Sequence, residues 1–257
     1  MNPDFVVDIG NTRIKWGKCS AAAVEKFVSL PSDDPAAWQT QLQDWHIQEK
    51  KTWIVSGVNP KTRTALIDWL GVQGQDVLLL DDPAQLPLRV KLERPDHVGM
   101  DRLLNAVAAN SRRPQGTTAV LIDAGSAVTV DWLDEEGAFC GGAIFPGLRL
   151  MTMALHSYTA LLPLITISKP SPALPARSTP EAVEAGVFWT VVGGINKIVE
   201  RMAGKGKPLV FLAGGDTGLL APCMDRPSLL WPEMTLEGIR LASGRCQPPV
   251  HTGRSRI

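Results

Sequence analysis

The chain has 257 residues, with 26 Lys and Arg residues against 26 Asp and Glu residues. Hydrophobic residues make up 44% of it and charged residues 20%, which is typical of a globular protein and not of a disordered chain. The net charge of zero argues against a protein that binds nucleic acid through a general excess of cations.

The first part of the chain alternates predicted strands with predicted helices. An apolar strand over residues 4–9 ends in Gly10-Asn11-Thr12, and a second strand over 14–19 follows at once, which predicts a hairpin. The later predicted elements are strand 24–30, helix 34–50, strand 52–58, helix 60–70, strand 77–80, loop 86–96 and helix 99–111. This alternation indicates parallel strand pairing in an α/β fold.

After a break at residues 112–116 the opening pattern recurs. Strand 118–123 ends in Asp and is followed by Ala124-Gly125-Ser126-Ala127 and a strand over 128–133. The remaining predicted elements are strand 138–145, helix 148–159, an exposed connection over 162–177, helix 179–202 and strand 209–213. We therefore predict two related halves, 1–115 and 116–257, each opened by strand–Asp–x–Gly–(Asn/Ser)–strand.

The cysteines and the apolar segments indicate the compartment. Four scattered cysteines without a CxxC pair are typical of reduced thiols in a cytoplasmic protein. The longest apolar runs, such as 118–122 and 187–194, fall far short of the roughly 20 residues that span a bilayer. The N-terminus lacks the basic and apolar regions of a secretory signal. We expect a cytoplasmic protein that binds neither a membrane nor nucleic acid.

The two Asp-x-Gly turns carry the groups that a phosphate site needs. Phosphate is bound by closely approaching backbone N–H groups, which favour Gly, and by hydroxyl or amide side chains, while a nearby carboxylate can hold Mg²⁺. Asp8 to Lys15 supplies all of these with a lysine in addition, and Asp123 to Ala127 supplies a second copy. Either turn alone is more typical of an ordinary hairpin. Their repetition favours a nucleoside triphosphate between two halves, held without a GxxxxGK[ST] loop.

Two further motifs are open to two interpretations. Asp101, in Gly99-Met100-Asp101-Arg102 at a helix start, either complements the helix dipole or is a general base for a substrate hydroxyl. Arg102 is either solvated or clamps a carboxylate or phosphate. Gly214-Gly215-Asp216 closes a strand and would let a base or ribose lie against the backbone.

In this order the motifs resemble those of the type III pantothenate kinase family. The match covers about residues 4–245, and it rests on Asp-x-Gly-Asn-Thr-x-x-Lys, Gly-x-Asp-Arg, Asp-Ala-Gly-(Thr/Ser)-Ala, Gly-Gly-Ala-Ile-x-Pro-Gly at 141–147, the helix start at 178–183 and Gly214-Gly215-Asp216. The resemblance implies two ribonuclease H-like halves with a central cleft, as in acetate and sugar kinases, heat-shock ATPases and actin. It also implies transfer of the γ-phosphoryl group of ATP, with Mg²⁺, to the 4′-hydroxyl of pantothenate, the first step of coenzyme A biosynthesis.

The resemblance assigns roles residue by residue. Asp101 would accept the proton, Asp123 would bind the monovalent cation, K⁺ or NH₄⁺, and Asp8 would organise Mg²⁺. The ATP-binding residues would be Asp8, Ile9, Gly10, Asn11, Thr12, Arg13, Ile14, Lys15 and Ser126. The pantothenate-binding residues would be Gly99, Met100, Asp101, Arg102 and Thr179, with Thr179 acting across the interface of a homodimer.

Two positions depart from the family pattern. Ser126 stands where the family usually has Thr, and the hydroxyl is retained. Leu92 stands where family members often have a Tyr near pantothenate, which predicts a reshaped substrate pocket. This keeps open a kinase of another small hydroxylated substrate, and a non-catalytic nucleotide-binding accessory or regulatory relative is the other alternative. The presence of Asp8, Asp101 and Asp123 favours catalysis.

Overall fold

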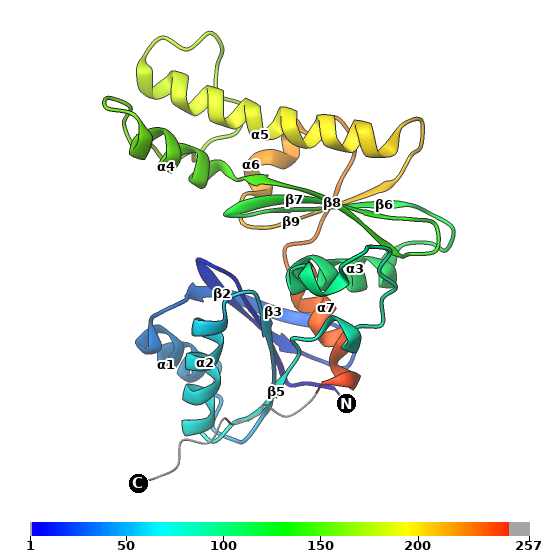
Figure 1. Cartoon of the computed structure of the whole chain (residues 1–257). Helices are drawn as coiled ribbons and strands as arrows, with labels where there is room; N and C mark the ends of the chain where they lie inside the picture. Colours follow the sequence, from blue (N-terminus) through cyan, green and yellow to red (C-terminus); the bar gives the residue numbers. More distant parts are fainter. Residues whose placement is uncertain (1, 247–257) are drawn as a thin grey trace. The chain divides into compact units, whose positions relative to one another are not determined.

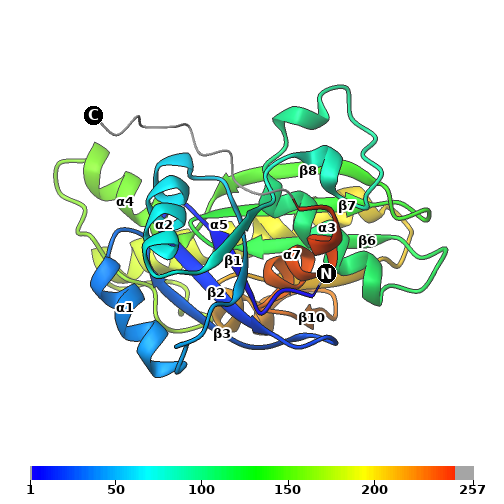
Figure 2. The same cartoon turned by 90° about the horizontal axis from the view of Figure 1, so that it is seen from below.

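The computed structural model describes residues 2–246, which form two compact units (Figures 1 and 2). Of the described residues, unit 1 holds 2–87, Arg94–Ala108 and 233–246, while unit 2 holds Leu88–Glu93 and Ala109–Pro232. These units differ from the halves 1–115 and 116–257 because the chain returns to unit 1 near its end. The division into those halves stays a prediction, and residues 247–257 lie outside the described residues.

Unit 1 is built on a mixed five-stranded sheet in the order β3-β2-β1-β4-β5. Its strands are β1 (Phe5–Ile9), β2 (Arg13–Cys19), β3 (Val24–Pro31), β4 (Thr52–Gly57) and β5 (Asp76–Leu79). The first three strands pair antiparallel, as the predicted hairpin requires, whereas β1, β4 and β5 pair in parallel.

Helices α1 (Pro35–Asp44) and α2 (Pro60–Val72) pack on one face of this sheet (Figure 1). Both begin with a side-chain cap and a proline, since Asp34 and Asn59 accept backbone N–H bonds. α1 ends six residues before the predicted limit of 50. The chain turns at His46, where φ is 54°, and the N–H of Ile47 bonds the carbonyl of Leu42 in a Schellman closure.

Helix α7 (Met234–Ala242), which sequence analysis did not predict, packs on strands of the same sheet. Glu237 Oε2 accepts the N–H of Val24 at 3.1 Å, and the Arg240 guanidinium binds both Glu237 oxygens. Helix α3 (Met100–Arg112) begins in unit 1, where a Cβ on Gly238 would lie 2.1 Å from the carbonyl oxygen of Leu104. Helix α7 is therefore stabilised by its packing and hydrogen bonds within unit 1.

Unit 2 repeats the same sheet, in the order β10-β9-β6-β7-β8. Its strands are β6 (Ala119–Ala124), β7 (Ala127–Leu133), β8 (Phe139–Pro146), β9 (Leu209–Ala213) and β10 (Leu229–Leu230). Again the first three strands pair antiparallel and the others join in parallel. The two equivalent sheets confirm the α/β class.

One face of the second sheet packs against helices (Figure 1). They are α4 (Leu148–Tyr158), α5 (Thr179–Ala203) and α6 (Thr217–Leu220). α5 begins at Ser178, whose Oγ accepts the N–H of Glu181. Among the described helices, α5 alone is long and apolar enough to cross a membrane, and its buried side chains pack into the core of unit 2 with those of the sheet. Single turns of 3₁₀ helix occur at Pro83–Gln85, Pro95–His97, Ala221–Cys223 and Ser243–Arg245.

We predict that Glu237→Ala lowers the free energy of unfolding by about 2–4 kcal/mol, because the N–H of Val24 and the Arg240 guanidinium both lose their acceptor in a buried setting. Glu200→Ala is the matched control. Its ion pair with Lys197 is exposed, so a change within about 0.5 kcal/mol is expected. Urea unfolding followed by tryptophan fluorescence measures both, and equal losses would contradict the role of α7.

Candidate active site

The turn between β1 and β2 presents a polar tip. The N–H of Gly10 donates to the carbonyl of Arg13 at 3.0 Å and closes the turn, so this N–H is already used. The side chains of Asn11 and Thr12 at the tip are exposed. The tip therefore offers amide and hydroxyl groups to a ligand.

The side chains around this turn point in different directions. Ile9 and Ile14 are fully buried in the apolar core of unit 1, so only their backbone can take part in binding. The Arg13 guanidinium bonds Ser29 on β3, with Nε 2.8 Å from its Oγ and a terminal nitrogen 3.0 Å from its carbonyl oxygen. Arg13 is thus held along the sheet.

A row of polar residues crosses the sheet just before the turn. Asp8 pairs directly with Lys15 on β2 and with Ser56 on β4. Paired residues project to the same face of a sheet, so a carboxylate, an ammonium and a hydroxyl lie side by side. The row places the predicted Mg²⁺ carboxylate and a lysine on the same face of the sheet.

A glycine that sequence analysis missed brings the end of β4 onto this strand. Gly57 has φ of 141°, and a Cβ there would lie 2.3 Å from the carbonyl oxygen of Ile9. The next residue, Val58, donates its N–H to the same oxygen at 2.9 Å. Only glycine permits this approach.

The start of α3 lies beside that junction. A Cβ on Gly99 would lie 3.6 Å from Val58 Cγ1 and 2.5 Å from Asp101 Oδ1, so the missing side chain of Gly99 leaves room for the Asp101 carboxylate. The same oxygen accepts the N–H of Arg102 at 2.9 Å. The helix N-terminus favours a charged carboxylate there. Met100 is buried, so its backbone alone can face a ligand.

Three loops of unit 2 meet at the Gly125-Ser126 turn. Gly147, which precedes α4, donates its N–H to Ser126 O at 2.9 Å, and a Cβ on it would lie 2.1 Å from Gly125 O. Gly214 has φ of 100°, and a Cβ there would lie 2.2 Å from Ala124 O. The Gly57–Ile9 junction of unit 1 therefore recurs in unit 2 as Gly214–Ala124. A search for the unit 1 equivalent of Gly214 is the signal that could have identified Gly57 in the sequence.

Asp216 follows this junction in unit 2. Its N–H donates to the carbonyl of Ala124 at 3.0 Å, which fixes the loop against the end of β6. Burial raises the pKa of the Asp216 carboxyl above its usual value. The carboxyl thus lies in a partly desolvated setting next to the Ser126 turn.

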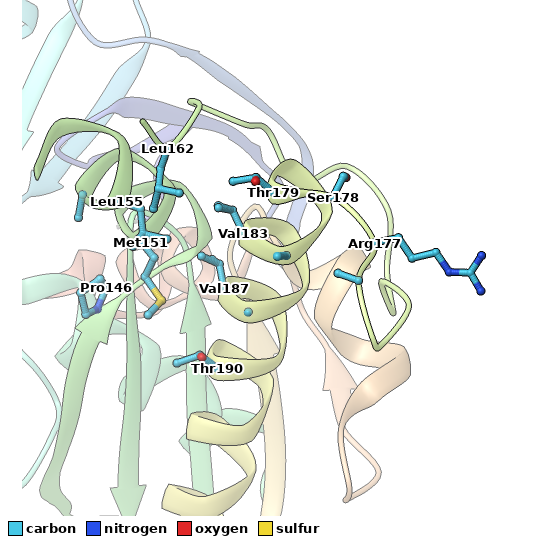
Figure 3. A pocket seen from close by; sticks show the side chains of 14 residues that line it. Pro146, Met151, Leu155, Leu162, Arg177, Ser178, Thr179, Val183, Val187 and Thr190 are labelled. Carbon is cyan, nitrogen blue, oxygen red and sulfur yellow. The ribbon is translucent and has the colours of Figure 1, made fainter. Parts of the chain in front are cut away.

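Thr179 lines a groove of about 910 Å³ between α4 and the first half of α5. Figure 3 shows Val183, Val187 and Thr190 projecting from α5 into this groove, while the side chain of Arg177 points away from it. Pro146, next to Gly147, also lines the groove. Because Pro146 pairs with Ala127, one end of the groove borders the Ser126 turn. The lining of the groove is mostly apolar.

In either unit, a bound cation would need oxygen ligands beyond carboxylates. Within residues 2–246, three or more His, Cys, Asp or Glu side chains nowhere form a metal-binding group. Two buried hydroxyls, Ser56 Oγ beside Asp8 and Thr129 Oγ1 beside Asp123, have no hydrogen-bond partner among the described residues. Hydroxyl and carboxylate oxygens are suitable ligands for hard cations such as Mg²⁺ and K⁺. The residues present fit the implied cations.

Comparison with known proteins gives a consistent result. A family model described as type III pantothenate kinase matches residues 5–201. A type III pantothenate kinase of Geotalea daltonii is 36% identical over 192 residues, covering 73% of each chain. One of Geotalea uraniireducens is 35% identical over 250 residues, covering 92% of this chain and 96% of the relative.

Solved structures share the fold at low identity. A Baf family transcriptional activator from Campylobacter jejuni has a TM-score of 0.59 and 18% identity, over 93% of this chain and 97% of its own. The activator of 2-hydroxyisocaproyl-CoA dehydratase from Clostridium difficile, with bound ADPNP, has a TM-score of 0.55 and 13% identity, over 94% and 93%. These likenesses support the two-sheet α/β architecture.

We predict that Gly57→Ala and Gly214→Ala each weaken nucleotide binding about tenfold or more and destabilise the fold by about 1–3 kcal/mol, because a Cβ at positive φ would press on Ile9 or Ala124. Gly71→Ala in α2 is the control, since nothing lies within 4 Å of its added Cβ. It should leave binding unchanged. Calorimetry with ATP measures nucleotide binding, and thermal melting measures stability. If Gly57→Ala and Gly214→Ala both bind ATP as tightly as the wild-type protein, the glycine junctions are not part of the nucleotide site.

Proposed function

This chain belongs to the type III pantothenate kinase family, within the actin-like ATPase superfamily, and from that membership we propose how its residues share the phosphorylation of pantothenate. The enzyme transfers a phosphoryl group from ATP, bound with Mg²⁺, to pantothenate in coenzyme A biosynthesis. Phosphoryl transfer requires mainly positioning and neutralisation of charge. The proposal therefore assigns to each residue either a substrate to hold or a charge to balance.

The β1–β2 turn binds the phosphates of ATP in this proposal. Asn11 and Thr12 are exposed at the tip and donate hydrogen bonds to phosphate oxygens. Asp8 would help to hold Mg²⁺, which would neutralise charge on the phosphates. Lys15, paired with Asp8, adds a positive charge. Ile9, Gly10, Arg13 and Ile14 contribute through the backbone and the shape of the turn.

Asp101 is the base that receives the substrate proton. The 4′-hydroxyl of pantothenate gives its proton to the Asp101 carboxylate, its oxygen forms a bond to the γ-phosphorus, and the bond from that phosphorus to ADP breaks. Arg102 binds the pantothenate carboxylate, with Gly99 and Met100 completing the contact. The observation that carries this assignment is the Asp101 carboxylate beside Gly99, next to the end of β4.

Unit 2 supplies the remaining contacts. Ser126 binds ATP through its hydroxyl, and Asp123 binds a monovalent cation, K⁺ or NH₄⁺. Thr179 contacts pantothenate bound to a partner subunit, so the enzyme is a homodimer. Exposed apolar side chains of β8, α4 and the following loop support a covered surface here, namely Ile144, Leu150, Met153, Tyr158, Leu161 and Leu164.

Location and specificity complete the proposal. Within residues 2–246 all four cysteines are free thiols, which supports a cytoplasmic enzyme. A Cβ on Gly141 would lie 3.1 Å from Leu92 Cδ2, so Leu92 packs against the backbone of β8 where family members often carry Tyr. A panel of sugars and small hydroxy acids beside pantothenate tests whether this change widens specificity.

We predict that Asp101→Asn lowers kcat for pantothenate phosphorylation by about 10²–10⁴-fold, because the amide cannot accept the proton. ATP affinity should stay within about twofold, since the residue does not hold the phosphates. Asp96→Asn is the control, an exposed carboxylate paired with Arg94. An ADP-release assay in K⁺ buffer measures turnover. If Asp101→Asn turns over at the wild-type rate, Asp101 is not the base.

We predict that Thr179→Ala and Asp101→Asn complement each other when mixed. Random exchange between two inactive homodimers gives mixed dimers with one intact site, and about one quarter of wild-type activity is expected. Light scattering of each variant alone checks that it is dimeric. Two dimeric variants that recover no activity after subunit exchange would show that Thr179 does not act across the interface.

A further inference from the structure

The two Asp-bearing hairpins differ at one position that matters electrostatically. Asp8 and Asp123 are each the next-to-last residue of the first strand of their sheet, and in each hairpin the Gly two residues later closes the turn. The cross-strand partner of Asp8 is Lys15, whereas the partner of Asp123 is Thr129. Thr129 therefore occupies in unit 2 the position that Lys15 occupies in unit 1.

The Thr129 hydroxyl is buried and lacks a partner. Its Oγ1 is inaccessible and makes no hydrogen bond with any residue that the structure describes. A buried hydroxyl in this state costs free energy, so such groups usually have a bound ligand or water as a partner. Directly paired residues have Cβ atoms about 4.5–5.5 Å apart. Oxygen atoms of Asp123 and Thr129 can therefore reach one small ion.

We propose that Thr129 Oγ1 is a ligand of the monovalent cation, beside the Asp123 carboxylate. This inference rests on the proposed function and adds a residue to its cation site. The ion would supply in unit 2 the single positive charge that the Lys15 ammonium supplies in unit 1. One carboxylate with neutral oxygens suits K⁺ or NH₄⁺, whereas the protein groups are too few for a divalent cage.

Two substitutions separate the hydroxyl from the shape of the side chain. Thr129→Val keeps the branched shape and removes the hydroxyl, whereas Thr129→Ser keeps the hydroxyl. We would titrate K⁺ into each protein with ADP and Mg²⁺ in choline buffer, following the melting temperature. Thallium(I) binding, observed by thallium NMR, reports the ion directly. Neither readout depends on turnover.

The expected pattern has two parts. Without K⁺, Thr129→Val melts about 2–4 °C above wild type, because it no longer buries an unpaired hydroxyl. With K⁺, wild type and Thr129→Ser are stabilised, whereas Thr129→Val responds only at K⁺ concentrations at least tenfold higher. If Thr129 had only a structural role, Thr129→Val would not both raise the melting temperature without K⁺ and weaken the response to K⁺.

The outcomes distinguish this inference from the proposed function. If Thr129→Val responds to K⁺ at the same concentrations as the wild-type protein, the inference is overturned. A buried water would then be the partner of the Thr129 hydroxyl. A wild-type protein that phosphorylates pantothenate equally well with and without K⁺, with no melting response, overturns the cation site and the inference together. A protein that responds to K⁺ through Thr129 but does not phosphorylate pantothenate overturns the proposed function alone.

Discussion

The candidate site depends on one close backbone approach that occurs once in each unit. The strand after the first crossover ends in a glycine at positive φ in unit 1 and is followed at once by one in unit 2. The α-carbon of each glycine lies so near the end of the first strand that a Cβ would overlap the backbone. In unit 1 this joins Gly57 to Ile9, and in unit 2 it joins Gly214 to Ala124. Because the Asp-bearing strand ends at each junction, the glycine of each unit determines which loops of that unit lie next to its own aspartate, Asp8 in unit 1 and Asp123 in unit 2.

Local sequence signals were sufficient where local physics decides the structure. The hairpins, the capped start of α5 and the Gly-x-Asp-Arg start of α3 could be predicted, because turn residues and caps act within a few positions. Helix α7 could not, since it is held by Glu237 bonding Val24, over two hundred positions away along the chain. The chain also returns to unit 1 at Glu233, and a division of the sequence at one boundary does not describe such a return.

The site shows a similar division between local and distant information. The resemblance to the family supplied Asp123, but Gly57 and Thr129 carry no motif of their own. Gly57 becomes meaningful only once β4 is paired with β1, and Thr129 only once β7 is paired with β6. The sequence specifies strand register only weakly at a polar face. The register shows that Lys15 and Thr129 occupy equivalent positions, one with a charged side chain and one with a neutral side chain.

The position of Asp101 agrees with the chemistry that phosphoryl transfer requires. The Asp101 carboxylate lies in the first turn of α3, where a helix favours negative charge, and it accepts the N–H of Arg102 at 2.9 Å. A loose, largely dissociative transition state demands little activation of the incoming hydroxyl, because the proton can leave late. In the proposed mechanism a carboxylate in this position is therefore enough, and the larger task of balancing phosphate charge is assigned to Mg²⁺, Lys15 and the monovalent cation. Under that proposal the phosphates are held by strand ends and glycine junctions, without a glycine-rich phosphate-binding loop.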